Sequence, residues 1–168
     1  MLEKKTGKLT GWIAYTISKT QYKIDGVNNN NYFSPRWDIR NNLSVTGSYQ
    51  LNRKWSVSST FKYTSGGFFT IPEGSFVYNG ASFSFYSQRN GYQIEPYHRL
   101  DLSFTYRSPK NNHRKRQSEW VYGIYNIYGR KNIYTLFARQ EGYIPTSTIF
   151  NKMYLFGIVP SITYNLKF

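Results

Sequence analysis

The sequence predicts an all-β protein, an antiparallel up-and-down meander of about six strands that forms a partial transmembrane β-barrel. Three observations lead to this prediction. Apolar and polar residues alternate along most of the chain with the period of two that is typical of strands. Aromatic residues make up 20% of the 168 residues, as expected where aromatic girdles mark both membrane interfaces. The links between the expected strands are long and short in turn.

The terminal segment, residues 154–168, shows the alternation most clearly. Successive side chains of a strand point to opposite faces, so this segment has one apolar face and one polar face. It ends on an aromatic residue, Phe168, as outer-membrane β-barrels commonly do. The apolar face carries Tyr154, Phe156, Ile158, Pro160, Ile162, Tyr164, Leu166 and Phe168, and the polar face carries Ser161, Thr163, Asn165 and Lys167.

Three strands are expected in the first half of the chain. Segment 8–23 places Ile13, Tyr15 and Ile17 on one face, and a polar turn-forming stretch follows it. In segments 37–51 and 55–71 most odd positions are apolar or aromatic, while most even positions carry Ser, Thr, Asn or a charge. Only three residues separate these two segments, which indicates a tight turn.

Two more strands are expected before the terminal one. Segment 97–107 alternates regularly, and segment 120–137 alternates less regularly because several aromatic and aliphatic residues follow one another. Residues 72–96 are rich in Gly, Ser and aromatic side chains and predict a long loop with a strand-like patch at 83–87. Residues 139–151 predict another loop.

The order of link lengths predicts how the chain is oriented in a membrane. The links after the first, third and fifth strands are long, and those after the second and fourth are short. Outer-membrane barrels have short periplasmic turns and long outer loops. If the last strand ends in the periplasm, the three long links lie outside. Trp12, Trp55 and Trp120 are then expected at the periplasmic interface, with Trp37 at the outer one.

Six segments in order carry a resemblance to a known family. The chain resembles the C-terminal barrel portion of a TonB-dependent outer-membrane receptor of the plug-carrying type (SusC-like, with a carboxypeptidase-regulatory-like domain). The segments are 11–20, 37–44, 55–72, 97–103, 125–132 and 160–168.

The resemblance implies a receptor that takes up a scarce ligand, such as a siderophore or an oligosaccharide, across the outer membrane of a Gram-negative cell. It implies as partners outer-membrane lipid, the barrel-assembly machinery, a plug domain, TonB and a surface lipoprotein. Such barrels have about 22 strands around a plugged lumen. Residues 1–168 are therefore expected to be a C-terminal barrel fragment without a plug, with its N-terminal part missing and no transport of its own.

The resemblance also assigns roles to individual residues. The end of the chain is what the barrel-assembly machinery is expected to read, with Phe168 as the principal residue and Leu166, Tyr164 and Ile162 behind it. Charged residues on the polar faces are candidates for contact with the lumen or the plug, and no ligand-binding residue is identified beyond the loop 72–96. These candidates are Arg40, Lys62, Arg99 and Asp101.

The composition argues against several other functions. There is no cysteine, and 8 carboxylates and 2 histidines show no spacing typical of a metal site or of a catalytic constellation. We therefore expect no enzyme activity, no metal and no cofactor. The net charge of +14 is scattered except for the short cluster 110–116, whereas a nucleic-acid site needs clustered cations. No nucleic-acid partner is expected.

Two alternatives remain open. One is a small or multi-chain outer-membrane barrel with a structural or adhesin role, in which several copies close one lumen. The other is a soluble all-β binding module, whose binding to a nucleic acid would weaken steeply with added salt.

Overall fold

The computed structural model describes residues 1–108, 117–141 and 147–167, and this part of the chain is all-β, as predicted. All strand pairs are antiparallel, and a three-residue 3-10 turn, Asn28–Asn30, is the only helical segment described. No helix in the described residues is long and apolar enough to cross a membrane. The strands are β1 (Leu2–Lys4), β2 (Leu9–Ile17), β3 (Asn41–Gln50), β4 (Trp55–Thr64), β5 (Phe68–Phe69), β6 (Gly74–Tyr78), β7 (Ala81–Phe85), β8 (Tyr92–Gln93), β9 (Tyr97–Arg107), β10 (Gln117–Tyr125), β11 (Ile133–Glu141), β12 (Ser147–Tyr154) and β13 (Val159–Lys167).

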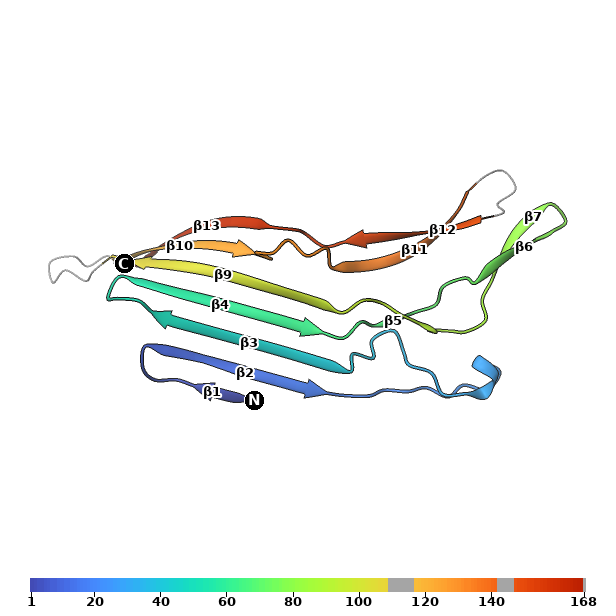
Figure 1. Ribbon diagram of the computed structural model, residues 1–168, viewed down its shortest axis with the longest axis horizontal. Coiled ribbons are helices and arrows are strands. Elements are labelled where there is room, and N and C mark those ends of the chain that lie inside the picture. Colours follow the sequence, from blue (N-terminus) through green and yellow to red (C-terminus); the bar gives the residue numbers. More distant parts are fainter. Residues whose placement is uncertain (109–116, 142–146, 168) are drawn as a thin grey trace.

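One seven-stranded sheet contains all the long strands that the sequence predicts. Its order is β1-β2-β3-β4-β9-β10-β13, so the six strands from β2 to β13 follow the chain order and each pairs with the next. Figure 1 shows them side by side, with β1 as a short strand beside β2. The predicted six-stranded antiparallel meander is confirmed.

The strand register keeps apolar residues on one face and polar residues on the other. Residues directly opposite each other in antiparallel strands share a face. One apolar row crosses all six strands through Leu9, Tyr49, Val57, Phe104, Tyr122 and Ile162. A polar row on the other face runs through Ser48, Ser58, Ser103, Gly123 and Ser161.

No second layer covers the apolar face in the described part of the chain. Phe104 in the centre of the sheet is 42% exposed, and Ile162 is 69% exposed. Phe33, at 7%, is the only large hydrophobic side chain that is buried among the described residues. A folded monomer of 19.8 kDa exposes roughly 8,600 Å², whereas this chain exposes 12,394 Å². The sheet therefore presents an apolar surface that the described residues do not bury.

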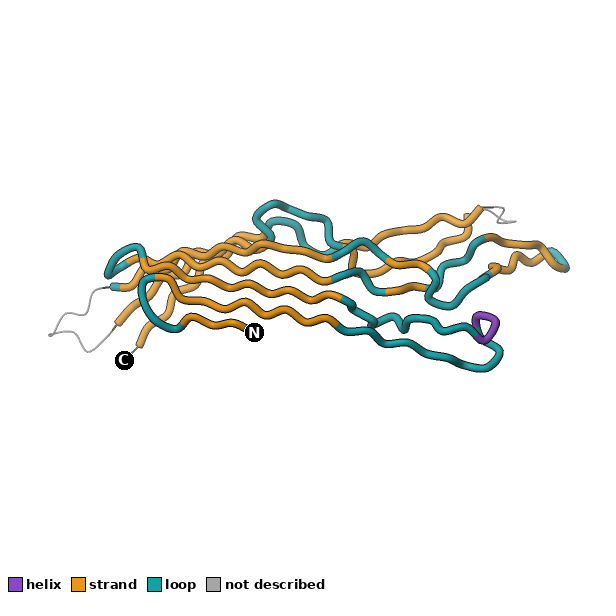
Figure 2. Tube along the Cα trace, turned by 60° about the horizontal axis from the view of Figure 1, so that its bottom comes forward, coloured by secondary structure: helices purple, strands orange, loops and turns teal. Residues whose placement is uncertain are grey.

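The two ends of the sheet differ as the link lengths predict. Residues 51–54 join β3 to β4 at one end, which we call the short-turn end. The links 18–40, 65–96 and 126–158 leave the opposite end, the loop end, where the small hairpins β6-β7 and β11-β12 continue the chain (Figures 1 and 2). The described links confirm the predicted alternation, while most of the short link expected after the fourth strand, with the basic cluster 110–116, lies outside the described residues.

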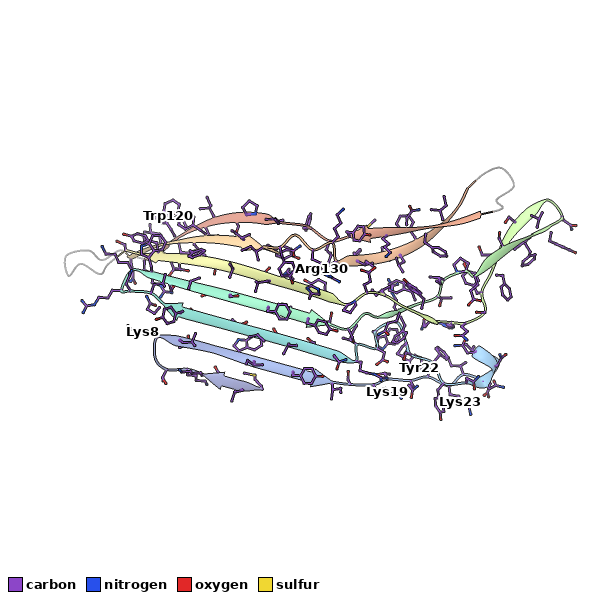
Figure 3. All side chains as sticks on the ribbon, viewed as in Figure 1. Lys8, Lys19, Tyr22, Lys23, Trp120 and Arg130 are labelled. Carbon is purple, nitrogen blue, oxygen red and sulfur yellow. The ribbon has the colours of Figure 1, made fainter. Side chains whose placement is uncertain are left out.

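A row of aromatic residues crosses four strands at the short-turn end. Trp55 lies opposite Tyr106, Tyr106 opposite Trp120, and Trp120 opposite Tyr164. The ring centroids are 5.0 Å apart in the first pair and 4.6 Å apart in the last, and Figure 3 shows Trp120 at this end. The expected position at this end is wrong for Trp12, which lies in the middle of β2 on the polar face.

The predicted strand 120–137 is confirmed only as far as Tyr125, where β10 ends and the chain leaves the sheet. Asn126 has a φ of 53°, a left-handed conformation that ends a strand. The chain resumes as β11 at Ile133 and pairs with β12 in a separate hairpin. The sequence predicts a loop over 139–151, but residues 139–141 belong to β11 and residues 147–151 to β12. Residues 142–146 lie outside the described part of the chain.

The terminal strand is shorter than predicted. β12 ends at Tyr154, and β13 begins only at Val159. Between them the amide of Leu155 donates to the carbonyl oxygen of Asn132 at 2.8 Å, so this segment is bonded to a loop rather than to the sheet. Phe168 lies outside the described residues. The predicted loop 72–96 contains the short strands β6, β7 and β8, and the strand-like patch at 83–87 overlaps β7.

We predict that Gly66→Ala destabilises the fold while Gly47→Ala does not. A Cβ on Gly66 would overlap the carbonyl oxygen of Ile94, whereas a Cβ on Gly47 meets nothing within 4 Å. Overpacking costs about 1–3 kcal/mol, which corresponds to roughly 2–10 °C in the unfolding midpoint of a chain of this size. Thermal unfolding followed by circular dichroism measures both variants, and equal midpoints would contradict the close approach at Gly66.

Candidate functional site

A charged cluster lies on the polar face where β9 and β10 reach the loop end. Arg99 and Asp101 are neighbours on this face of β9, and Nη2 of the arginine is 2.9 Å from Oδ2 of the aspartate. The Arg99 guanidinium lies over the ring of Tyr125 on β10, 3.9 Å from its centroid. Both charged side chains are mostly buried, so the pair is shielded from water and has a fixed geometry.

Asp101 connects this ion pair to the loop that follows β10. Its Oδ1 accepts a hydrogen bond from the amide of Asn126 at 2.9 Å. The Asn126 side chain is fully buried; its Nδ2 donates to the carbonyl oxygens of Arg130 and Phe156 at 2.9 and 3.1 Å, and its Oδ1 accepts from the Arg130 amide at 3.2 Å. One asparagine thus joins the end of β10 to the segment that leads into β13.

The same loop also holds the beginning of β9. Asn132 is buried, and its side chain exchanges two hydrogen bonds with the backbone of His98, at 3.1 and 3.0 Å. The guanidinium of Arg130, labelled in Figure 3, donates from Nη2 to the carbonyl oxygen of Pro96 at 3.0 Å. We call the loop 126–132 the asparagine clamp, because its two buried asparagines bind three backbone segments.

The sequence prediction missed the asparagine clamp. The sequence assigns residues 125–132 to a strand, on which Asn126 and Asn132 would lie on the same face as Tyr122 and have no special role. The composition of residues 125–132 already argues against a strand interior, because these eight residues include two asparagines, Gly129 and two basic residues.

The structure brings together only two of the four candidate lumen residues. Arg99 and Asp101 form the ion pair described above. Lys62 on β4 lies directly opposite Arg99 and shares the polar face, but its side chain is exposed. Arg40 lies just before β3 and is exposed, and its carbonyl oxygen accepts from the amide of Ser18 at 3.0 Å.

The described residues of the expected assembly signal share one face at the end of the chain. Ile162, Tyr164 and Leu166 lie on the exposed apolar face of β13. Tyr164 closes the aromatic row by its contact with Trp120. The fourth residue, Phe168, is outside the described part of the chain.

Two of the long links are bonded to each other at the loop end. The Asn28 side chain donates to the carbonyl oxygen of Arg89 at 3.0 Å and accepts from its amide at 2.7 Å. Asn90 donates to the carbonyl oxygen of Ser34 at 3.0 Å and also binds the Thr70 hydroxyl. Cavities of about 510 and 400 Å³ lie beside these contacts and share Arg89 and Asn90 in their walls. The sequence had indicated only 72–96 as a possible ligand-contacting loop.

An exposed ion pair joins the β11-β12 hairpin to the segment before β9. Nζ of Lys152 lies 2.9 Å from Oε1 of Glu95. The hydrogen bond and the charge of Lys152 lower the pKa of Glu95 below its ordinary value, and Glu95 raises the pKa of Lys152 for the same reasons. The pair therefore stabilises this contact at intermediate pH. The contribution is lost as the pH falls through the lowered pKa or rises through the raised one.

The described residues hold no cluster of three or more His, Asp or Glu side chains that fits a metal ion. On the polar face the described residues include hydroxyl groups, amides, the shielded Arg99–Asp101 pair and a more exposed ion pair between Arg107 and Glu119. Such groups bind or position a ligand or a protein surface. Comparisons of the chain with protein-family models, with curated proteins and with solved structures found no match.

We predict that Asn126→Ala destabilises the chain by about 3 kcal/mol or more, because it leaves buried backbone groups unpaired at about 1–3 kcal/mol each. Asn79→Ala is the matched control, since Asn79 has a similar φ of 48° but is exposed in the β6-β7 turn. Denaturant unfolding gives the two free energies, and hydrogen exchange at the Arg130 amide reports the lost bond. A cost for Asn126→Ala no larger than that for Asn79→Ala would contradict the clamp.

We predict that Lys152→Gln raises the pKa of Glu95 back toward its ordinary value, because the substitution removes both the hydrogen bond and the positive charge that lower it. An NMR titration of the Glu95 carboxyl carbon measures the change. Lys131→Gln, at an exposed lysine of the asparagine clamp, is the control and leaves most of the shift in place. An unchanged Glu95 pKa in Lys152→Gln would show that the ion pair does not form in solution.

Proposed function

We propose that the chain is part of the β-barrel of a TonB-dependent outer-membrane receptor and contributes to the uptake of a scarce ligand. In this proposal the six-stranded meander is a partial transmembrane barrel, and transport requires the complete receptor. The observation that carries the proposal is the continuous apolar face of the sheet, which nothing in the described chain covers.

An uncovered apolar face of this size is unfavourable in water. Monomeric soluble proteins rarely expose contiguous apolar patches above a few hundred Å², and larger patches mark interaction or membrane surfaces. A lipid bilayer removes the cost, because its acyl chains replace the missing second layer. Strands can then cross the membrane, since every backbone group of a closed barrel pairs with a neighbouring strand.

The dimensions of the apolar face fit a bilayer. Trp55 belongs to the aromatic row at the short-turn end, and Tyr63 lies on the same face of β4 near the loop end. These positions span the nine residues 55–63, and a tilted transmembrane strand needs about 9–11 residues. At the loop end Tyr63 lies opposite His98, whose Nδ1 is 2.7 Å from the Tyr128 hydroxyl. Aromatic rings that carry a polar atom therefore lie at both ends of the apolar face, which is where the two membrane interfaces would be.

The two edges of the sheet support a larger barrel. β13 pairs only with β10 in the described part of the chain, and β1 covers only the residues Gly11–Ile13 of β2. Unpaired strand edges promote association with further strands. The resemblance to plug-carrying receptors implies about 22 strands, which would pair with both edges. The polar face would then line the lumen and contact the plug through Lys62, Arg99 and Asp101.

The proposed orientation places the short-turn end in the periplasm and the loop end outside the cell. Outer-membrane barrels have long loops on the outer side. The barrel-assembly machinery would read the terminal residues Ile162, Tyr164, Leu166 and Phe168. TonB and a surface lipoprotein would act on the complete receptor.

We predict that Leu102→Arg prevents insertion into lipid vesicles while Ser103→Arg is tolerated. Leu102 lies in the middle of the apolar face of β9 and its neighbour Ser103 lies on the polar face. An arginine near the membrane midplane costs about 2–4 kcal/mol on the lipid side, whereas on the lumen side it stays in water. The fraction of chain that becomes protease-resistant in phosphatidylcholine vesicles, measured along a urea series, compares the two variants.

Two outcomes of this comparison would count against the proposal. One is an equal effect of the two arginines, which would mean that the two faces do not meet different solvents. The other is a monodisperse monomer of the unmodified chain in buffer without detergent, because a water-stable monomer cannot carry this uncovered face.

A further inference from the structure

The larger cavity at the loop end has walls from three separate parts of the chain. Residues of the links 18–40 and 65–96 form most of it, and Leu136 of β11 completes it. Its volume of about 510 Å³ falls within the roughly 300–1,000 Å³ typical of small-molecule sites. We call it the loop-end cavity. Its aromatic and cationic wall residues are Tyr22, Phe33, Trp37, Phe69, Arg36 and Arg89.

We propose that the loop-end cavity binds an anionic ligand that carries a planar apolar group, such as an aromatic carboxylate. The inference deepens the proposed function and rests on it in one respect, since a receptor with its loops outside the cell would meet its ligand here.

The charge of the cavity favours an anion. Arg36 and Arg89 both belong to its wall, and no described wall residue carries a carboxylate. Asp38, which follows Trp37 in the sequence, is buried. Its Oδ1 accepts from the amide of Thr20 at 2.9 Å, and its Oδ2 accepts from the Ser34 hydroxyl at 2.8 Å. These neutral donors hold the carboxylate away from the cavity wall but leave its charge in place, so two arginines against one carboxylate still give this region a net positive charge.

Arg36 is held in a position suited to a carboxylate. Its guanidinium carbon lies 4.3 Å from the centroid of the Phe69 ring. Stacking on an aromatic ring uses the face of the guanidinium and leaves its N–H groups, which lie in the plane, free to donate. Two parallel N–H donors match the two oxygens of a carboxylate.

The aromatic rings provide a surface for the planar part of the ligand. Tyr22 contacts Phe33 and Trp37 edge to face, with ring centroids 6.2 and 6.0 Å apart. Trp37 is still 66% exposed, so its ring retains area for a further contact. Figure 3 shows Tyr22 among the long links, at the end of the molecule opposite Trp120.

The walls are held in place before any ligand binds. Tyr22 and Phe33 exchange two backbone hydrogen bonds, at 2.8 and 2.9 Å. The Asn28 side chain fixes the backbone of Arg89 from the opposite link, and Asn90 is bonded to Ser34. A site that is already ordered loses little conformational entropy on binding.

The test uses the whole 168-residue chain in nonionic detergent, with 2-naphthoate as the probe and the 2-naphthylmethylammonium cation as its counterpart. Ligand-observed NMR titration measures both affinities, and empty micelles correct for partition into detergent. The unmodified chain is expected to bind the anion at least about tenfold more tightly than the cation, since a charge-assisted hydrogen bond contributes about that factor.

Variants locate the binding. Arg36→Gln and Arg89→Gln each remove one donor, so each is expected to reduce the affinity for 2-naphthoate about tenfold. Trp37→Ala is expected to weaken both probes severalfold, because it removes ring surface without changing charge. Arg53→Gln, in the exposed turn at the other end of the sheet, is the matched control and leaves both affinities unchanged. Circular dichroism of each variant establishes that its strands are retained.

The proposal is overturned if the two probes bind equally, or if Arg36→Gln and Arg89→Gln bind 2-naphthoate as the unmodified chain does. Its failure can be told apart from failure of the proposed function. A chain that inserts into vesicles but does not prefer the anion refutes the cavity inference alone. A chain that prefers the anion but is a stable monomer without detergent supports the cavity inference and refutes the membrane assignment.

Discussion

The register between neighbouring strands sets both faces of the sheet. Side chains alternate along a strand with a period of two, so a slip of one residue in any pair would move that strand's apolar side chains to the polar face. Cross-strand hydroxyl pairs lie within this register, including Ser58 Oγ donating to Ser48 Oγ at 2.9 Å and the Thr46–Thr60 hydroxyls 3.3 Å apart. The apolar face, the aromatic row and the charged cluster all require that no strand has slipped.

The register alone does not determine where the sheet ends, and the asparagine clamp supplies that boundary. At the loop end the strands β9, β10 and β13 would continue into unpaired backbone. Instead, Asp101 accepts from the Asn126 amide at the end of β10, the Asn126 side chain donates to the Phe156 carbonyl oxygen before β13, and the Asn132 side chain donates to the His98 carbonyl oxygen in β9. The clamp therefore separates a regular sheet, whose faces are set by alternation, from loops whose conformation is set by individual side-chain hydrogen bonds. This division also separates the proposed membrane surface from the proposed ligand site.

The sequence predicted the parts that depend on period two and missed those that depend on individual contacts. The order of the strands, the two faces and the alternation of link lengths follow from local pattern and were predicted. Segment 120–137 was misassigned because Tyr125, Ile127 and Tyr128 fit a strand, while the hydrogen bonds that end the strand come from Asp101 and from Asn126 itself. The loop-end cavity could not be predicted, because its walls come from segments that are distant in sequence and have no shared period.

The polar face contains an electrostatic imbalance that bears on its role. Lys62 and Arg99 are directly opposite each other, and like charges in that relation destabilise a strand pair. Arg99 is drawn to Asp101 and to the Tyr125 ring, which reduces the repulsion but leaves Lys62 exposed as a positive charge near the loop end of a surface rich in hydroxyl groups. Hydration stabilises the exposed Lys62 ammonium group, so the unpaired charge destabilises the sheet only modestly. In the barrel that we propose, this face meets the plug, and an acidic side chain of the plug opposite Lys62 would balance the charge that the sheet itself leaves uncompensated.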